Sequence, residues 1–118
     1  MDGSEDVSPA LAALCTPEVM SDSDLFFVHL DERERSVTLG FARQNGGEGF
    51  EFFLRFPQAR EVRVRGWAHP GRKDVRVADD GDGVEVVVSA PGSSLSFRAA
   101  GVALARTRSF PVWERLGP

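Results

Sequence analysis

Two histidines and a set of carboxylates are the residues of this 118-residue chain whose side chains could support acid–base chemistry. His29 and Asp31 stand two positions apart in an alternating segment. A strand would therefore place them on one face, where the carboxylate could orient the imidazole. His69, the other histidine, shares no HxH or HxxxH spacing with His29, which makes zinc binding a poor interpretation. A sheet histidine hydrogen-bonded across to Thr38 is the simpler prediction, and an enzyme that uses His29 with Asp31 or Thr38 is the lesser alternative.

Cys15 is the single cysteine, which excludes an intramolecular disulfide and any zinc site built from several cysteines. It follows Leu14 in a short apolar segment without a glycine-rich neighbourhood, so we interpret it as a small buried hydrophobe rather than a nucleophile. The acidic stretch 79–83 suggests calcium, but EF-hand spacing requires glycine at the position of Glu85. Aspartate and glycine are the usual turn residues, so the stretch predicts a polar hairpin loop. The sequence therefore predicts no catalytic residue, no metal and no cofactor.

The charge is divided unequally along the chain, whose formal net charge is −4. Residues 1–34 hold nine acids and one base and carry −8, whereas residues 35–118 hold nine acids and 13 bases and carry +4. An acidic end joined to a mildly basic body disfavours general nucleic-acid binding, which needs a positive face. The acidic end could be a solvated tail, or it could attract a basic protein partner by electrostatic steering.

Four arginines could line one outward face of the third to fifth predicted strands: Arg55, Arg63, Arg65 and Arg76. A basic sheet face binds RNA when aromatic rings are interleaved with the arginines, so that bases can stack. Phe53 is the only ring that the alternation clearly places on this face. We therefore predict no nucleic-acid binding, and we expect the arginines to pair across strands with Glu51, Glu61 and Asp74.

From Asp24 onward the apolar residues alternate with a period of two, which is typical of half-buried strands. A hairpin folded around Arg33 and Glu34 gives a self-consistent register. On one face it predicts three pairs: Leu30 with Val37, Val28 with Leu39, and Phe26 with Phe41. On the other face Phe27 would cover the bare backbone of Gly40. A slip by one residue would lose these matches, so the register is well specified.

Later segments predict six further short strands by the same alternation. Their inward apolar residues are Phe50, Phe52, Leu54 and Phe56 in the third strand, Val62 and Val64 in the fourth, Val75 and Val77 in the fifth, Val84, Val86 and Val88 in the sixth, Leu95 and Phe97 in the seventh, and Val102 and Leu104 in the eighth. A turn at Pro91-Gly92 would pair Val88 with Leu95 and Val86 with Phe97. The fold class is mainly β: an antiparallel meander of about eight short strands forming a curled sheet, a sandwich or an open barrel. A short N-terminal helix is predicted to start at Ser8-Pro9.

The chain is short enough to form one domain. We predict a disordered acidic N-terminus over residues 1–8, a single β-rich domain over residues 9–110 and an irregular tail over residues 111–118. No apolar run approaches the length of about 18 residues that a membrane helix needs. The N-terminus is acidic where a secretory signal would be basic. Together with the single cysteine, these observations predict a cytoplasmic protein that does not enter a membrane.

Gly66-Trp67 is the most distinctive dipeptide of the chain. A tryptophan at the end of a strand often closes the open end of a core, and this is the interpretation that we favour for Trp67. The alternative is an exposed anchor for a partner, because tryptophan is frequent among the residues that dominate binding energy.

Three stretches together resemble a known protein family: VHLDERERSVTLGF at 28–41, FEFFLRFPQAREVRVRGW at 50–67 and VEVVVSAPGSSLSFRAAGVALARTRSF at 84–110. They are similar to the immunity protein 50 family of bacterial polymorphic toxin systems. Its members carry a comparable Val-Thr-Leu hairpin, a phenylalanine-rich strand leading to Gly-Trp and a strand ending in a Phe-x-Ala step. The similarity covers roughly residues 22–110. It implies a non-catalytic protein that binds a cognate toxin and neutralises it in the cytoplasm of the producing cell.

An immunity protein of this kind usually blocks the active site of its toxin or locks the toxin in an inactive state. Many toxins attack nucleic acids and have basic clefts, so an acidic patch would raise the association rate with, for example, a basic nuclease. The candidate partner-binding residues lie around the first hairpin and at the Gly-Trp turn: Asp22, Asp24, Asp31, Glu32, Glu34 and Trp67. The alternative function is a small-ligand-binding β domain, in which some of the nine phenylalanines line a pocket.

Overall fold

The computed structural model describes residues 23–67 and 73–111 of the chain. These residues form eight antiparallel strands, as the alternation predicts, and no helix. In chain order the strands are β1 (Asp24–Asp31), β2 (Ser36–Asn45), β3 (Glu48–Phe56), β4 (Arg60–Arg65), β5 (Asp74–Asp79), β6 (Val84–Ala90), β7 (Ser93–Ala99) and β8 (Ala103–Pro111). The expected helix from Ser8-Pro9, the acidic N-terminus 1–8 and residues 112–118 of the expected tail lie outside the described residues.

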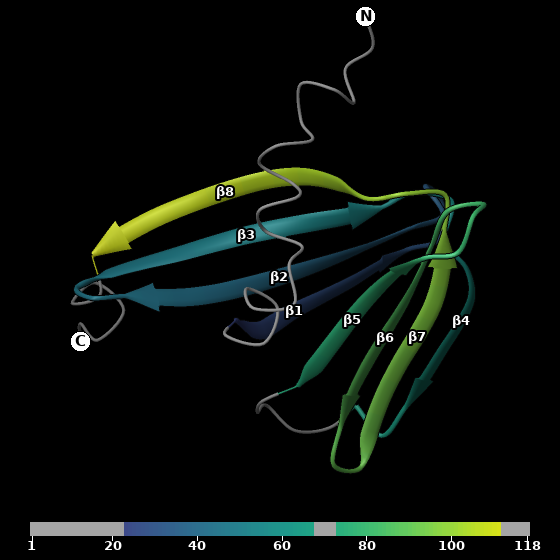
Figure 1. The fold of residues 1–118 in the computed structure, drawn as a ribbon, viewed down its shortest axis with the longest axis horizontal. Helices are drawn as coiled ribbons and strands as arrows, with labels where there is room; N and C mark the ends of the chain where they lie inside the picture. The colour runs from purple at the N-terminus through teal and green to yellow at the C-terminus, as the bar shows by residue number, and fades with distance from the viewer. Residues whose placement is uncertain (1–22, 68–72, 112–118) are drawn as a thin grey trace, which may run out of the picture.

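The strands form two four-stranded sheets rather than one continuous meander (Figure 1). The first sheet has the order β1-β2-β3-β8, and the second has the order β4-β7-β6-β5. Strands β1 to β3 and β5 to β7 are meanders, as predicted, but β4 pairs with β7 and β8 pairs with β3. The prediction of a meander throughout was wrong because a short connection can also carry the chain into a second layer, which each sheet needs to bury its apolar face. The result is two packed antiparallel sheets, the second of which has a Greek-key order.

The two sheets are joined at one end of the molecule, where the chain crosses between them (Figure 1). Two backbone hydrogen bonds hold the β3–β4 link there. Ala59 N–H donates to the Arg35 carbonyl at 2.6 Å, and Ala100 N–H donates to the Pro57 carbonyl at 2.9 Å. Away from this corner the strands of the two sheets run at a steep angle to each other and diverge. The corner therefore holds the end of β1 beside the start of β4.

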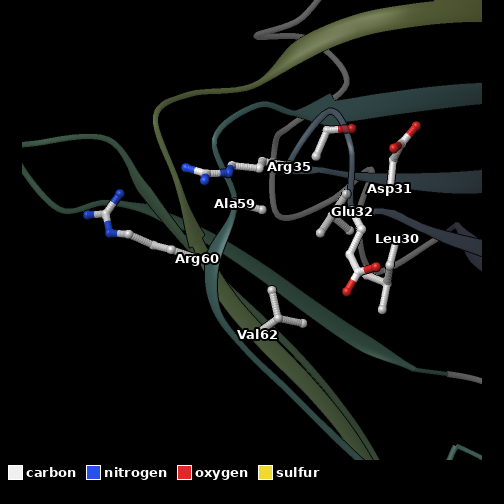
Figure 2. Close-up of a pocket in the computed structure, with 9 residues that line it drawn as sticks. Leu30, Asp31, Glu32, Arg35, Ala59, Arg60 and Val62 are labelled. Atoms are coloured by element: carbon white, nitrogen blue, oxygen red, sulfur yellow. The ribbon is translucent and has the colours of Figure 1, made fainter.

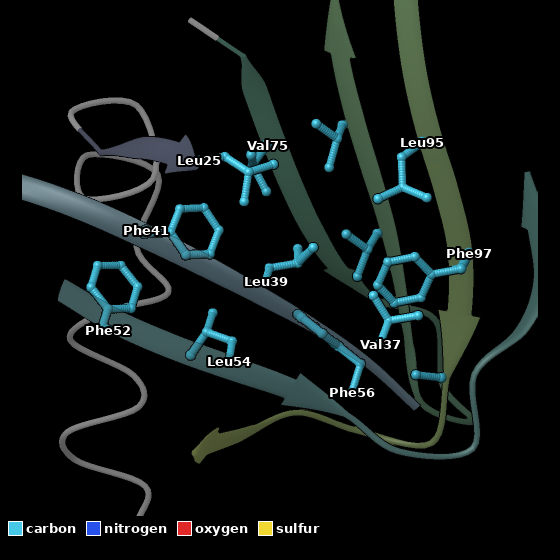
Figure 3. Packing of buried hydrophobic residues seen from close by; sticks show 13 residues of the cluster. Leu25, Val37, Leu39, Phe41, Phe52, Leu54, Phe56, Val75, Leu95 and Phe97 are labelled. Carbon is cyan, nitrogen blue, oxygen red and sulfur yellow. The ribbon is translucent and has the colours of Figure 1, made fainter. Parts of the chain in front are cut away.

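The core lies between the sheets and draws apolar side chains from both (Figure 3). In the described part of the chain its buried residues are Leu25, Val37, Leu39, Phe41, Phe52, Leu54, Phe56, Val75, Val86, Val88, Leu95, Phe97 and Ala99. Phe56 and Phe97 join the two sheets directly, with their ring centroids 5.2 Å apart in an edge-to-face contact. The β6–β7 hairpin confirms both predicted pairs, Val88 with Leu95 and Val86 with Phe97. The phenylalanines of β3 and β7 thus fill the space between the sheets.

The β1–β2 hairpin confirms most of its predicted register. Three predicted pairs are present: Leu30 with Val37, Val28 with Leu39, and Phe27 with Gly40. The predicted pair of Phe26 with Phe41 is wrong, because a β-bulge between Leu25 and Phe27 places Leu25 opposite Phe41. Leu25 is buried in the core, and Phe26 is exposed. A bulge adds one residue to a strand, so a strict two-residue period cannot reveal it.

Candidate functional site

Two edge strands border an opening on one side of the molecule: β1 at the edge of the first sheet and β4 at the edge of the second. The opening contains two hollows, of about 490 Å³ and about 240 Å³, that share Leu30 as a lining residue. The larger hollow is lined mainly by Leu30, Asp31, Glu32, Arg35, Ala59, Arg60 and Val62 (Figure 2). The smaller hollow is lined by Val28, Leu30, Val64, Trp67 and Leu95. We refer to the two hollows together as the edge groove.

Strand β4 supplies one wall of the edge groove. Val64 lies opposite the buried Leu95 of β7, so Val62 and Val64 occupy the core side of their strand. They are nevertheless 40% and 48% exposed, and Leu30 on β1 is 49% exposed. Strand β4 therefore alternates apolar and polar residues like a strand of the core, but it is the edge strand of its sheet. Strand β1 of the first sheet does not cover its apolar side chains. Apolar side chains that stay exposed around one hollow are typical of a binding surface.

Trp67 follows the end of β4 and borders the smaller hollow. The preceding Gly66 has a φ of 59°, and a Cβ at this position would collide with the Gly92 carbonyl oxygen, so the chain needs glycine here. Beyond this turn the Trp67 side chain is 37% exposed, and Lys73 Nζ lies 5.2 Å from its ring centroid. The Trp67 ring therefore lies at the border of the core, in the same hollow as the buried Leu95, and is partly open to solvent.

Three of the predicted carboxylates meet at the turn between β1 and β2: Asp31, Glu32 and Glu34, which we call the acidic turn. Asp31 and Glu32 line the larger hollow (Figure 2). The Asp31 carboxylate accepts a hydrogen bond from the Glu34 amide at 3.0 Å, which stabilises the turn. Glu34 Oε1 lies 3.4 Å from Nη2 of Arg55 on β3. Both side chains of this ion pair are largely exposed, so solvent screening leaves it a small contribution to stability.

The structure does not bring all the predicted carboxylates together. Asp24 is exposed at the opposite end of β1, about 20 Å from Asp31 at the usual rise of a strand. Asp22 lies outside the described residues. Arg35 and Arg60 line the larger hollow beside the acidic turn. The rim of the groove therefore has mixed charge. The sequence analysis predicted an acidic patch because it counted the charges of residues 1–34 alone, and both arginines follow that segment.

His29 is exposed on the outer face of the first sheet and lies opposite Thr38 in the register, the position that the predicted hydrogen bond requires. Its ring stacks on Phe27 with the two centroids 6.2 Å apart. His29 and Asp31 both line an open hollow at the acidic turn. Within residues 23–67 and 73–111, no group of three or more histidine, cysteine, aspartate or glutamate side chains is placed to hold a metal ion. Cys15 and His69 lie outside the described residues.

Sequence reasoning missed an aromatic cluster on the outer face of the first sheet. The bulge brings Phe26 and Phe27 to this face together, and their rings meet Phe53 edge-on at centroid distances of 5.8 Å and 5.7 Å. The Arg106 guanidinium lies 4.6 Å from the centroid of Phe53. The prediction counted rings on the third to fifth strands alone, whereas the rings that meet Phe53 come from β1 of the same sheet. Two consecutive phenylalanines in an alternating strand were the available signal, because a bulge is needed to turn such a pair to one face.

The four arginines predicted on one face are divided between the two sheets. Arg55 lies on β3 of the first sheet, whereas Arg63, Arg65 and Arg76 lie on β4 and β5 of the second. Arg76 pairs with Asp74 of its own strand β5, with 3.0 Å between Nε and Oδ2, and not across strands as predicted. Arg55 pairs with Glu34 of the β1–β2 turn. The continuous arginine row predicted for the third to fifth strands therefore does not form, because these strands are not neighbours.

The acidic stretch 79–83 forms the predicted hairpin loop between β5 and β6. Two of its carboxylates are bound by the local backbone. Gly81 N–H donates to Asp79 Oδ1 at 2.9 Å, and Asp82 N–H donates to Asp80 Oδ1 at 3.0 Å. Asp80 also pairs with Arg98, at 3.5 Å. These are the hydrogen bonds by which aspartate stabilises tight turns, and they account for the acidic composition of the stretch.

Comparison with models of known families, with curated proteins and with solved structures returned no match to this chain. Membership of the immunity protein 50 family stays a prediction from the sequence stretches at 28–41, 50–67 and 84–110. Among the described residues, no helix has the length and apolar character needed to cross a membrane.

Proposed function

We propose that this protein binds another protein at the edge groove and neutralises it without catalysis, as an immunity protein does with its cognate toxin. One observation carries the proposal. Four of the seven exposed large apolar residues in the described part of the chain line this one groove: Leu30, Val62, Val64 and Trp67. Single exposed apolar residues need no explanation, but a contiguous group with a charged rim is typical of a protein-binding site.

The open form of the edge groove favours a protein over a small ligand. A small ligand is usually enclosed on most sides, whereas this groove lies between two strand edges and has a rim of acidic and basic side chains. The larger hollow, of about 490 Å³, has a volume within the usual range of ligand pockets, so a small-ligand-binding domain stays the alternative function. Such a ligand would also have to use the groove, because buried side chains fill the core between the sheets.

Each part of the site has a distinct role in the proposed complex. Val62, Val64 and Trp67 form the centre that is desolvated on binding, and tryptophan is frequent among the residues that dominate binding energy. Asp31 and Glu32 lie at the rim, where negative charge speeds up the encounter with a basic surface such as the cleft of a nuclease. A partner held there would have its cleft covered, so neutralisation needs no catalytic residue. We place this event in the cytoplasm of the producing cell.

A survival assay tests the proposed function. The reading frame immediately upstream of this gene is expressed in a heterologous host with the wild-type chain, with Val64→Asp or with Val87→Asp. Val87 is the matched control, because it is also an exposed valine of the second sheet but lies on its outer face. We expect the neighbour to kill, the wild type and Val87→Asp to restore growth, and Val64→Asp to fail although its circular dichroism matches that of the wild type. A harmless neighbour, or full rescue by Val64→Asp, would contradict the proposal.

A further inference from the structure

We infer that the partner contributes an extended segment that pairs with the free edge of β4 and adds one strand to the second sheet. The segment would carry apolar side chains facing the edge groove, in alternation with acidic side chains on the opposite side. This inference rests on the proposed function and specifies the chemistry of the partner.

The backbone of β4 is available on one side. Strand β4 is the outermost strand of the second sheet and pairs with β7 through Arg63–Ser96, Val64–Leu95 and Arg65–Ser94. The register shifts between Arg60 and Arg63, where Glu61 has a φ of 54°, so the regular part of the strand is Val62–Arg65. Along the other side of this stretch no strand in the described part of the chain is hydrogen-bonded. Extended peptides add to such edges through main-chain hydrogen bonds.

The edge groove determines which residues the added strand needs on its core side. A new strand beside β4 would lie about 4.8 Å from it, which places it over the groove. Its core-side residues would contact Val62, Val64 and Leu30, which are all about half exposed without a partner. Because covering them removes apolar surface from water, the residues at these positions must be apolar, and they recur at every second position of a strand.

The outer side of β4 determines the charge of the remaining positions. Arg63 and Arg65 lie on this side, opposite Ser96 and Ser94 of β7. Neither arginine has an ion-pair partner among the described residues. An acidic side chain directly across from them would be attracted, and a basic one would be repelled. The segment that fits β4 therefore alternates apolar with acidic residues.

A second copy of this chain fits the regular part of this edge, Val62–Arg65, poorly. Antiparallel pairing brings residues of the same side together, so a dimer centred on Arg63 would place that arginine against its own copy. A dimer centred on Val64 would place Arg63 against Arg65. Both arrangements set like charges directly opposite each other, which is unfavourable. The arginines of β4 thus act against self-association and in favour of an acidic partner segment.

The test titrates the full-length protein with capped six-residue peptides up to millimolar concentration and follows its amide NMR signals. One peptide alternates glutamate with valine, a second alternates lysine with valine, and a third is the glutamate–valine peptide with all backbone amides N-methylated. We expect the first to bind at least tenfold more tightly than the second, and the third not to bind. The shifts should centre on Val62–Arg65 and Leu30. Arg63→Glu with Arg65→Glu should reverse the charge preference, whereas Arg76→Glu, on the opposite edge of the same sheet, should preserve it.

Equal affinity for the glutamate and lysine peptides, or shifts centred on β5 or β8, would overturn the inference. The survival assay separates this failure from a failure of the proposed function. If the wild-type chain rescues growth but the peptides do not discriminate, the partner binds in another way and the inference is wrong. If the peptides bind as expected but no toxin is neutralised, the edge chemistry holds and the proposed function is wrong.

Discussion

Strands β6 and β4 carry the same alternating valines and use them differently. Val86 and Val88 on β6 are completely buried, whereas Val62 and Val64 on β4 stay about half exposed. Strand β6 is an inner strand of its sheet and faces the first sheet across the core. Strand β4 is an edge strand and lies beside the groove. Alternation therefore determines which face of a strand is apolar. The position of the strand in the sheet determines whether this face stabilises the fold or is left for a partner.

The largest effect on the free energy of unfolding should come from a substitution in the buried core between the sheets. Phe97→Ala removes a ring that is buried against Phe56, so we expect a loss of about 3–5 kcal/mol in the free energy of unfolding. Val64→Ala on the open side should change it by less than about 0.5 kcal/mol. Urea denaturation of the two variants measures both values. Similar losses at the two positions would show that the edge groove is closed in solution.

Gly40 tests whether an outer face can be packed as tightly as the core. A Cβ at Gly40 would lie 2.6 Å from Cε2 of Phe53 and 2.9 Å from the Cβ of Phe27, so Gly40→Val forces the aromatic cluster apart. We expect a cost of about 1–3 kcal/mol, which is typical of overpacking. Gly101→Val is the control, because a Cβ there meets nothing within 4 Å. Thermal or urea denaturation distinguishes the two, and equal stability of both variants would mean that the cluster is loosely packed.

The rim of the groove should affect the rate of binding more than the fold. Asp31→Asn combined with Glu32→Gln removes two charges beside the larger hollow. We expect association with a basic partner to slow by roughly tenfold at low salt, with a weaker salt dependence and little change in dissociation. Asp24→Asn, at the far end of β1, is the control. Stopped-flow fluorescence measures the rates, and an equal slowing per removed charge in the control would show that only the total charge matters.

The smallest effect should be that of Glu34→Gln. The Glu34–Arg55 pair is 3.4 Å long, and both side chains are largely exposed, so we expect a change below about 0.5 kcal/mol in the free energy of unfolding. Urea denaturation at low and high salt measures it. A larger loss that disappears at high salt would show that the acidic turn stabilises the hairpin as well as forming the rim.

The strands and the hairpin registers could be predicted from the sequence because local patterns determine them. The pairs Leu30–Val37 and Val88–Leu95 follow from alternation on either side of a short turn. The bulge at Phe26 could not be predicted in this way, since it breaks the period that the prediction uses. The pairing of β4 with β7 is also beyond local patterns, because it depends on how two layers cover each other.

Single residues of the candidate site could be predicted from the sequence, but their arrangement around one groove could not. The acidic residues of the β1–β2 turn and Trp67 were identified by charge and by residue type, but nothing local indicates that they border one groove. This juxtaposition depends on the corner, where the backbone of Ala59 binds that of Arg35 and holds the start of β4 beside the turn. The exposure of Val62 and Val64 has the same origin, since an alternating strand is equally consistent with the middle or the edge of a sheet.

Hydrogen exchange of the chain, alone and in complex with the neutralised partner, tests the central claim most directly. If the edge groove is the binding site, amide exchange should slow along Val62–Arg65 of β4 and at Leu30–Glu32. The opposite edge of the second sheet, Asp74–Asp79, should exchange as it does in the free protein. Slower exchange on the outer face of the first sheet alone, around Phe27 and Phe53, or an unchanged β4 in a stable complex, would contradict the account.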